Sequence, residues 1–233
     1  MDKPYSYQDS LHLLNDSEWN KLGIQNRRSV MQSVENEAAK RDGRQPCNVS
    51  IFSEPPSNGM ITAGQYNPNT GAIEMNEHYL QRASSNESLI TIMHEGRHAY
   101  QHRAVKGEIS HQDKSQLAAW QNNMKPGHYI TAEQNRRAHY RQPIEADARE
   151  YASITSRQIQ GEQRVQNGAN KGIESFREKT ANATNNSAKP APNKGIESFR
   201  ERAKQGNNGS AHNAITGGKS EGQGQTQGGG QGR

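Results

Sequence analysis

The chain has 233 residues, a formal net charge of +5 and a hydrophobic content of 29%. That content lies far below the ~45–50% of typical globular proteins, so we exclude one folded domain built from the entire chain. A single cysteine excludes an intramolecular disulfide framework and a zinc site built from cysteines. The apolar residues must therefore be concentrated in one part of the chain.

Residues 166–233 have the composition of a segment without a core. They hold 13 of the 22 glycines and too little apolar surface to offset the entropy lost on ordering. They also carry 10 of the 29 Lys and Arg but 5 of the 24 Asp and Glu, which leaves 19 of each sign before them. We therefore expect one neutral folded domain, 1–165, followed by a disordered basic tail rich in Gly, Gln and Asn.

The sequence lacks the features of a membrane protein, of a protein with a secretory signal and of a sequence-specific nucleic-acid binder. No apolar run approaches the ~20 residues of a membrane span, and the N-terminal residues lack the apolar stretch of a secretory signal. No base-reading motif is present, so sequence-specific nucleic-acid binding is not expected. We expect a protein that is cytoplasmic when synthesised and that would need a specialised secretion system for export.

The first half of the chain predicts a helix and then a small sheet. Asp16 or Ser17 can cap a helix that continues to Arg41, with Gly43 just past its end. Three β-type runs follow, and the turn-forming residues NPNTG join the last two as a hairpin. We expect these strands, in a small antiparallel sheet, at 47–52, 61–66 and 72–76.

The second half predicts mostly helices. Ser84 and Glu87 have the spacing of a capping box, which opens a helix through Val105. Pro143 suits the first turn of another helix, which Gly161 would end. Between them, shorter helices are expected over 114–124 and after the capping residue Thr131. The apolar side of the helix that opens at Ser84 is formed by Leu89, Ile90, Ile92 and Met93. This order predicts an α+β fold.

The tail contains one internal repeat. The nonapeptide NKGIESFRE occurs at 170–178 and again at 193–201. One interpretation is a duplicated, solvated spacer. The other is a pair of docking or sorting peptides for an export or docking partner, in which the second copy adds avidity.

The motif with the clearest chemistry is His94-Glu95-Gly96-Arg97-His98, an H-E-x-x-H string. On a helix, His94 and His98 lie one turn apart on the same face, where both imidazoles can reach one Zn²⁺. Glu95 then lies beside the metal, where it can take a proton from a metal-bound water and pass it to a leaving amine. The motif also falls on the helix that the capping box and the apolar pattern predict independently.

A catalytic zinc needs a third ligand from the protein. His102 lies eight residues beyond His94, about 12 Å along a continuous helix, so one ion cannot bind both, and we expect His102 at the surface or behind the ligands. Glu145 is a better candidate, because it opens a later helix whose small neighbours Ala148 and Ala152 permit close packing. A carboxylate that stabilises the helix N-terminus is the alternative interpretation of Glu145.

HEGRHAYQ followed by QPIEADAREYA resembles the minimal gluzincins, especially ImmA/IrrE-like metallopeptidases and related domains of bacterial toxins and effectors. The resemblance covers about 50–165, most specifically 91–102 and 142–152. It implies a zincin-like fold with Zn²⁺ bound by His94, His98 and Glu145, Glu95 as the base, and Asp147 as a polar group behind the ligands. Arg149 departs from the larger gluzincin pattern, which has an aspartate there.

The rest of such a site is less specified by the sequence. In zincins an edge strand precedes the metal helix, and the strand 72–76 is expected to play that part, pairing with a peptide by strand addition. An oxyanion formed from the substrate carbonyl needs a hydrogen-bond donor. The candidates between the two motifs are His128, Tyr129, His139 and Tyr140.

The favoured hypothesis is a zinc-dependent metalloendopeptidase of the bacterial effector or toxin-like kind, acting on a protein or peptide. An alternative is a binding or regulatory module with a zincin fold but no catalysis, whose repeat-bearing tail recruits a partner. A third hypothesis keeps the zinc but changes the bond that is hydrolysed, because an activated water also attacks esters and other acyl groups.

Overall fold

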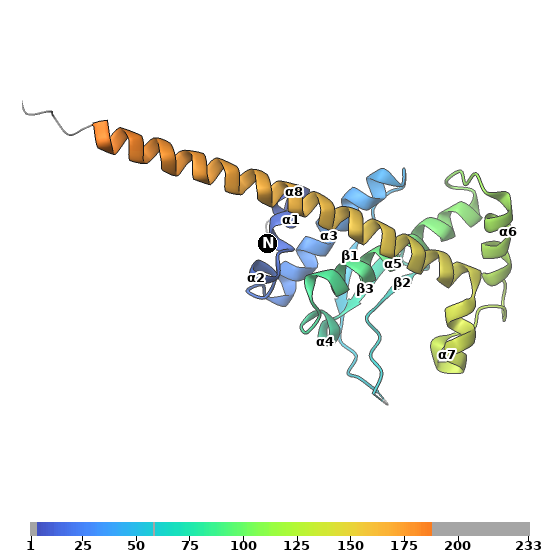
Figure 1. Ribbon diagram of the computed structural model, residues 1–233. Helices are drawn as coiled ribbons and strands as arrows, with labels where there is room; N and C mark the ends of the chain where they lie inside the picture. Colours follow the sequence, from blue (N-terminus) through green and yellow to red (C-terminus); the bar gives the residue numbers. More distant parts are fainter. Residues whose placement is uncertain (1–3, 58, 188–233) are drawn as a thin grey trace, which may run out of the picture. The chain divides into compact units, whose positions relative to one another are not determined.

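The computed structural model describes residues 4–57 and 59–187. Residues up to Lys179 form one compact unit, separate from Thr180–Arg233. The helices are α1 (Tyr7–Leu13), α2 (Asp16–Trp19), α3 (Ile24–Arg41), α4 (Glu77–Leu80), α5 (Ser85–Lys106), α6 (Lys114–Asn123), α7 (Ala132–Arg141) and α8 (Pro143–Ser187). The strands are β1 (Val49–Phe52), β2 (Gly64–Asn67) and β3 (Ala72–Asn76) (Figure 1). The α+β class expected from the sequence is confirmed.

The N-terminal segment is more divided than predicted. In place of one helix from residue 16 or 17 to Arg41, α2 and α3 are separated by a short turn, and Gly23 is the extended residue that precedes α3. The break lets Trp19 enter the core, where it is fully buried and its indole N–H donates to the carbonyl of Ala83 at 3.0 Å. Gly43, with φ +67°, follows the end of α3 as predicted.

The sheet has three strands in the order β1-β3-β2. The hairpin of β2 and β3 is confirmed, but β1 pairs with β3 in parallel, so the sheet is mixed and the prediction of an antiparallel sheet is wrong. Because β1 takes the second side of β3, this strand is central, and the prediction that 72–76 is an edge strand is also wrong. Alternate residues Ile73 and Met75 are fully buried, which directs one face of β3 into the core.

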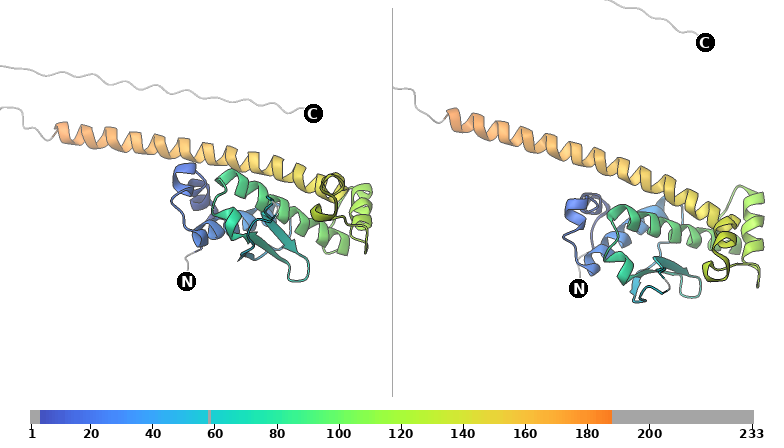
Figure 2. Two further views of the ribbon diagram at one scale, coloured as in Figure 1. Left: turned by 90° about the horizontal axis from the view of Figure 1, so that it is seen from below. Right: turned by 60° about the horizontal axis from the view of Figure 1, so that its bottom comes forward.

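Helix α5 passes through the middle of the unit. The capping box of Ser84 and Glu87 is confirmed, and Leu89, Ile92 and Met93 are buried as predicted, whereas Ile90 is 41% exposed and lies on the other side of the helix. Helix α5 packs on β2 and β3 and against α3. The first turns of α8 lie on the side of α5 away from the sheet (Figure 2), where Ala148 and Ala152 are fully buried.

Helix α8 begins at Pro143 as predicted, but it does not end at Gly161. It continues to Ser187, across the expected boundary at residue 165 and through the first repeat copy, 170–178. Contacts with the N-terminal segment explain this continuation, because Gln166 donates to the carbonyl of Gln8 and the amide of Asn167 donates to Asn15. The second copy, 193–201, and the rest of the tail lie outside the described residues.

A second, smaller core lies at the C-terminal end of α5. It buries Ala104 of α5, Trp120 of α6 and Ile144 of α8, and so joins the helix of the H-E-x-x-H motif to the start of α8. The predicted helices at 114–124 and after Thr131 correspond to α6 and α7, and Thr131 forms the expected cap, with Gln134 as its partner. Within the described residues, no helix has the length and apolar character needed to cross a membrane.

Candidate metal centre

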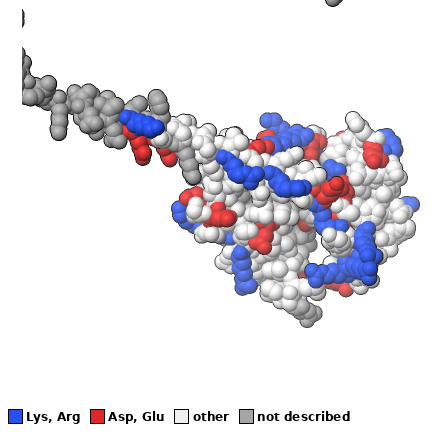
Figure 3. Space-filling model, viewed as in Figure 1, with Lys and Arg blue, Asp and Glu red and all other residues white. Residues whose placement is uncertain are grey.

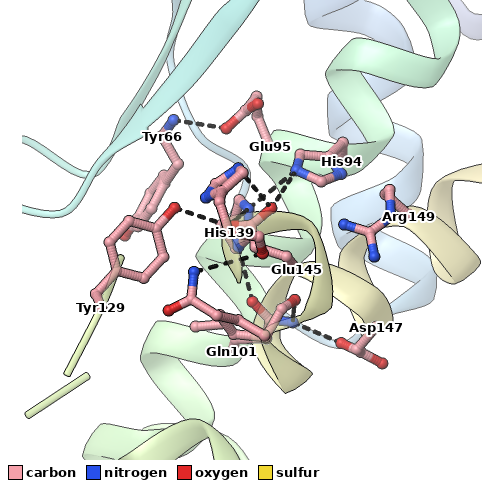
Figure 4. A network of polar contacts seen from close by, with 12 residues as sticks. Tyr66, His94, Glu95, Gln101, Tyr129, His139, Glu145, Asp147 and Arg149 are labelled. Atoms are coloured by element: carbon pink, nitrogen blue, oxygen red, sulfur yellow. Dashed lines mark hydrogen bonds and ion pairs between the residues drawn. The ribbon is translucent and has the colours of Figure 1, made fainter. Parts of the chain in front are cut away.

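Two histidines of α5 and one glutamate of α8 meet at a single point. The Nε2 atoms of His94 and His98 are 3.1 Å apart. One carboxylate oxygen of Glu145 lies 3.3 Å from His94 Nε2, and the other lies 3.4 Å from His98 Nε2. Figure 4 shows His94 and Glu145 directed toward one another. The structure thus brings together the three residues that the sequence and the resemblance pointed to, and they form a group that could hold a metal ion.

The spacing within this group suits a small tetrahedral cation. Ligands bound at 2.0–2.1 Å in tetrahedral directions lie about 3.3 Å from one another, and the three measured separations are 3.1, 3.3 and 3.4 Å. Glu145 is 2% exposed, and a buried carboxylate needs a positive or hydrogen-bonding partner. The geometry and the donor set both fit a bound divalent ion.

Gln101, one turn after His98, determines which ring nitrogen of His98 carries the hydrogen. The Gln101 amide nitrogen donates to the carbonyl of Ile144 at 2.9 Å and to Asp147 at 2.6 Å, so its oxygen faces His98 Nδ1 at 2.8 Å. That oxygen can only accept, and Nδ1 therefore carries the hydrogen. In the neutral ring this leaves a lone pair on Nε2, which is the tautomer that ligates a metal.

Without a metal, protons take the place of the missing positive charge. Burial alone would lower the pKa of His98, but the carboxylates of Glu145 and Glu95 outweigh it and raise the pKa to about 9. Burial alone would raise the pKa of Glu145, yet the hydrogen bonds and charges of both histidines hold it far below its ordinary range. Both directions indicate that the carboxylates favour positive charge on the neighbouring imidazoles.

Glu95 lies next to the group but is not a member of it. It is 8% exposed, and its carboxylate accepts the backbone N–H of Tyr66 at 2.8 Å. Tyr66 belongs to β2, so the edge strand beside the motif is β2 and not the predicted 72–76. Gly64 permits this close approach, because a Cβ there would lie 3.1 Å from Thr91 and 3.6 Å from the Glu95 side chain.

A buried ion pair supports the motif from the opposite side of α5. Arg44 and Glu35 have fully buried side chains and are hydrogen-bonded to each other, and Glu35 also accepts the backbone N–H of Cys47. A Cβ on Gly96 would lie 2.9 Å from the Arg44 guanidinium and 3.0 Å from the Glu35 carboxylate. The glycine inside the motif therefore allows α5 to pack against this pair.

Asp147 lies behind the ligands and touches none of the three. Its carboxylate accepts two hydrogen bonds from Arg97, at 2.8 and 3.1 Å, and one from Gln116 at 3.1 Å. Its link to His98 passes through Gln101. Arg97 therefore points toward Asp147 and away from the candidate ligands.

The structure separates the four candidate hydrogen-bond donors into two pairs. The Tyr129 hydroxyl donates to Glu145 at 2.8 Å, and His139 Nε2 lies 3.6 Å from the same carboxylate (Figure 4). Burial and the charge of Glu145 raise the pKa of Tyr129, so its hydroxyl remains a donor. His128 is exposed and away from the group, and Tyr140 is 59% exposed beneath the Arg149 guanidinium.

His102 is not part of the group, as its spacing predicted, and packs edge-on against the Tyr66 ring. The functional residues that the sequence reasoning missed are Gln101, Tyr66 and Gly64. Only Gln101 had a readable signal, because a residue three positions after His98 shares its helix face. The contact of Tyr66 depends on strand register and had none.

Comparison of the chain with models of protein families, with curated proteins and with solved structures finds no match in any of the three. The candidate metal centre therefore stands on the distances, burial and hydrogen bonds of this chain.

Proposed function

We propose that the protein is a zinc-dependent metalloendopeptidase, with His94, His98 and Glu145 as the zinc ligands and Glu95 as the general base. The observation that carries the proposal is the convergence of two imidazoles and one carboxylate at tetrahedral spacing. A second carboxylate, that of Glu95, lies on the same turn of α5, and its charge acts on His98. Zinc is favoured over Mg²⁺ or Ca²⁺ because two of the three ligand atoms are imidazole nitrogens. The α+β layout, with the ligand helix beneath a small sheet, is compatible with the zincin-like fold that the resemblance implies.

The chemistry divides between the metal and the protein. Zinc with an open position lowers the pKa of a bound water to about 7 and polarises a carbonyl. Glu95 can accept the proton of the attacking water, because its carboxylate lies next to the ligand group without belonging to it. The same carboxyl can return that proton to the leaving amine. Its hydrogen bond with Tyr66 fixes the position from which it acts.

Tyr129 and His139, from α7 and the residues before it, are the candidate hydrogen-bond donors to the transition state. The Tyr129 hydroxyl donates to the Glu145 carboxylate, so this donor is close to where an oxyanion would develop. His139 Nε2 lies 3.6 Å from the same carboxylate, but its Nδ1 faces the carbonyl of Ile130, so Nε2 can donate only from the protonated ring. A peptide that binds by strand addition would pair with β2, since β2 is the sheet edge that faces α5.

Two variants of the full chain test the proposal. Glu95→Gln should retain one zinc per chain and the parental fold but lose hydrolysis of a quenched fluorescent peptide mixture. Glu145→Ala should lose both zinc and hydrolysis. Glu108→Gln, an exposed residue just past the end of α5, is the matched control and should behave like the parent.

Three results would contradict the proposal in different ways. Equal cleavage by Glu95→Gln and the parent would remove Glu95 as the base. Unchanged, tight zinc binding by Glu145→Ala would remove Glu145 from the ligand set. A zinc-loaded parent that cleaves esters but no peptide, or neither, would favour one of the two alternative hypotheses.

A further inference from the structure

Helix α7 presents a group of arginines that have no acidic partner. Arg136, Arg137 and Arg141 are exposed, and none forms an ion pair with another described residue. Figure 3 shows blue side chains gathered over this part of the unit. Arg149 of α8 adds a fourth cation, stacked on the Tyr140 ring and donating to the Tyr140 carbonyl. We call these four residues the α7 arginine surface.

This surface lies beside the candidate metal centre. His139, between Arg137 and Arg141 on α7, has its Nε2 3.6 Å from the Glu145 carboxylate. Arg149 is one helical turn beyond Glu145 on α8 and is drawn beside the group in Figure 4. The α7 arginine surface thus shares a helix with His139, and its fourth member, Arg149, follows Glu145 on α8.

Around α7 the charges not already engaged are mostly positive, although residues 125–150 as a whole carry five Lys and Arg against four Asp and Glu. Between residues 125 and 150 the two buried or half-buried acids, Glu145 and Asp147, are already engaged. The exposed acids there are Glu133 and Glu150, against Lys125 and the four arginines. Arg137 and Arg141 are four residues apart on one helix, an arrangement of like charges that destabilises a helix until an anion neutralises it.

We propose that the α7 arginine surface binds an acidic segment of the polypeptide substrate and so directs the enzyme toward peptide bonds flanked by Asp or Glu. This inference rests on the proposed peptidase function, but the binding surface itself does not require catalysis. The chain's own tail is a poor occupant, because residues 166–233 carry 10 Lys and Arg against 5 Asp and Glu. A nucleic acid is disfavoured because the cations occupy one short helix on an otherwise neutral unit, whereas nucleic-acid sites extend over a wide basic face.

The test is a binding measurement on the full chain carrying Glu95→Gln, so that no probe is consumed. A fluorescein-labelled oligoglutamate peptide is titrated at low ionic strength and followed by anisotropy, with oligolysine and a single-stranded oligodeoxynucleotide as comparison probes. The triple variant Arg136→Glu, Arg137→Glu, Arg141→Glu should bind oligoglutamate at least about tenfold more weakly. It should fold normally, because α7 contains no buried residue, and circular dichroism checks this.

The matched control reverses three exposed arginines elsewhere on the same unit, Arg82→Glu, Arg157→Glu and Arg164→Glu. It has the same net charge as the triple variant and should bind within about twofold of the parent. If both variants lost the same affinity for oligoglutamate, the binding would depend on net charge alone and the proposal would be overturned. The proposal would also be overturned if the parent bound the oligonucleotide but not oligoglutamate, and if the α7 triple variant lost that oligonucleotide binding.

A second measurement separates this inference from the proposed function. With zinc-loaded chain carrying native Glu95, kcat/KM is compared for peptides with Glu or with Lys flanking the same central sequence. The parent should prefer the Glu-flanked peptide, and the α7 triple variant should lose that preference. If no peptide is cleaved while oligoglutamate still binds through α7, the peptidase proposal fails and the acidic-partner surface stands. Cleavage without any flanking preference in the parent would refute the specificity claim alone.

Discussion

Helices α5 and α7 both place a histidine against Glu145, yet they are held in very different ways. Both begin with a capping box. Helix α5 buries eleven residues, among them Leu89, Ile92 and Met93, whereas α7 buries none. His94 and His98 of the candidate metal centre are thus fixed by the main core, while His139 stands on a surface helix. The positions of His94 and His98 can therefore stay fixed while α7 changes.

The attachment of α7 is local. Asn135 interrupts its helical backbone with ψ 99°, and the segment is held mainly by hydrogen bonds among its own neighbours. Gln142 donates to the carbonyl of Ile130, and His139 Nδ1 lies 3.1 Å from the same oxygen. A segment with few buried contacts opens at lower free energy than the core does. We expect α7 to move without disturbing His94 and His98.

The largest effect should come from the ion pair beneath the H-E-x-x-H motif. Glu35→Ala leaves Arg44 charged and buried without its carboxylate, which should lower the free energy of unfolding by about 3–5 kcal/mol. Urea denaturation measures this change. The matched change on α7, Glu133→Ala at an exposed position, should stay within about 0.5 kcal/mol. Similar losses in both variants would contradict the contrast between the two helices.

A smaller effect is expected from the residue that orients His98. Gln101→Leu removes the acceptor of the Nδ1 hydrogen, so zinc affinity should fall about 10–100-fold, as measured by competition with a chromogenic chelator. Gln121→Leu, an exposed glutamine of α6, is the control and should leave the affinity unchanged. A Gln101→Leu protein with parental zinc affinity would show that Gln101 only fills space.

The metal-free protein should lose stability as the solution becomes alkaline. The pKa of His98 is raised from 6.5 to about 9 in the folded state, so its protonation stabilises the fold fully below about pH 6.5. That stabilisation, on the order of 3 kcal/mol, should disappear as the pH rises through about 9. Thermal unfolding with a chelator measures it across this range.

Two comparisons sharpen this pH prediction. Saturating zinc should remove most of the decline, because the metal replaces the proton between the ligands. Glu145→Gln should weaken the decline in the metal-free protein, because one of the two carboxylates that raise the pKa of His98 is gone. A profile that declines equally in that variant would assign the effect to another group.

The smallest effect concerns the two capping residues. Ser84→Ala on α5 should lower the free energy of global unfolding by about 1 kcal/mol. Thr131→Ala on α7 should leave global unfolding unchanged and accelerate hydrogen exchange only within α7. Hydrogen exchange read by mass spectrometry distinguishes the two outcomes. Loss of global stability in Thr131→Ala would mean that α7 folds together with the core.

Much of the fold could be predicted because its signals are local. The Ser84–Glu87 cap, the turn residues NPNTG and the opening Pro143 each act within a few residues, and each was confirmed. The break at Gly23 and the passage of α8 through Gly161 were missed. Both depend on distant partners, since Trp19 enters the core beside Ala83 and α8 is held by the N-terminal segment.

The sequence by itself determined which residues could ligate a metal, because the spacing of His94 and His98 on one helix face follows from helix geometry alone. Only the tertiary structure decided that Glu145 meets them, that β2 and not 72–76 lies beside Glu95, and that Gln101 selects the tautomer of His98. Helix period is set by covalent geometry within a single turn. Contacts between residues separated by tens of positions are set by the packing of whole elements, which no local pattern encodes.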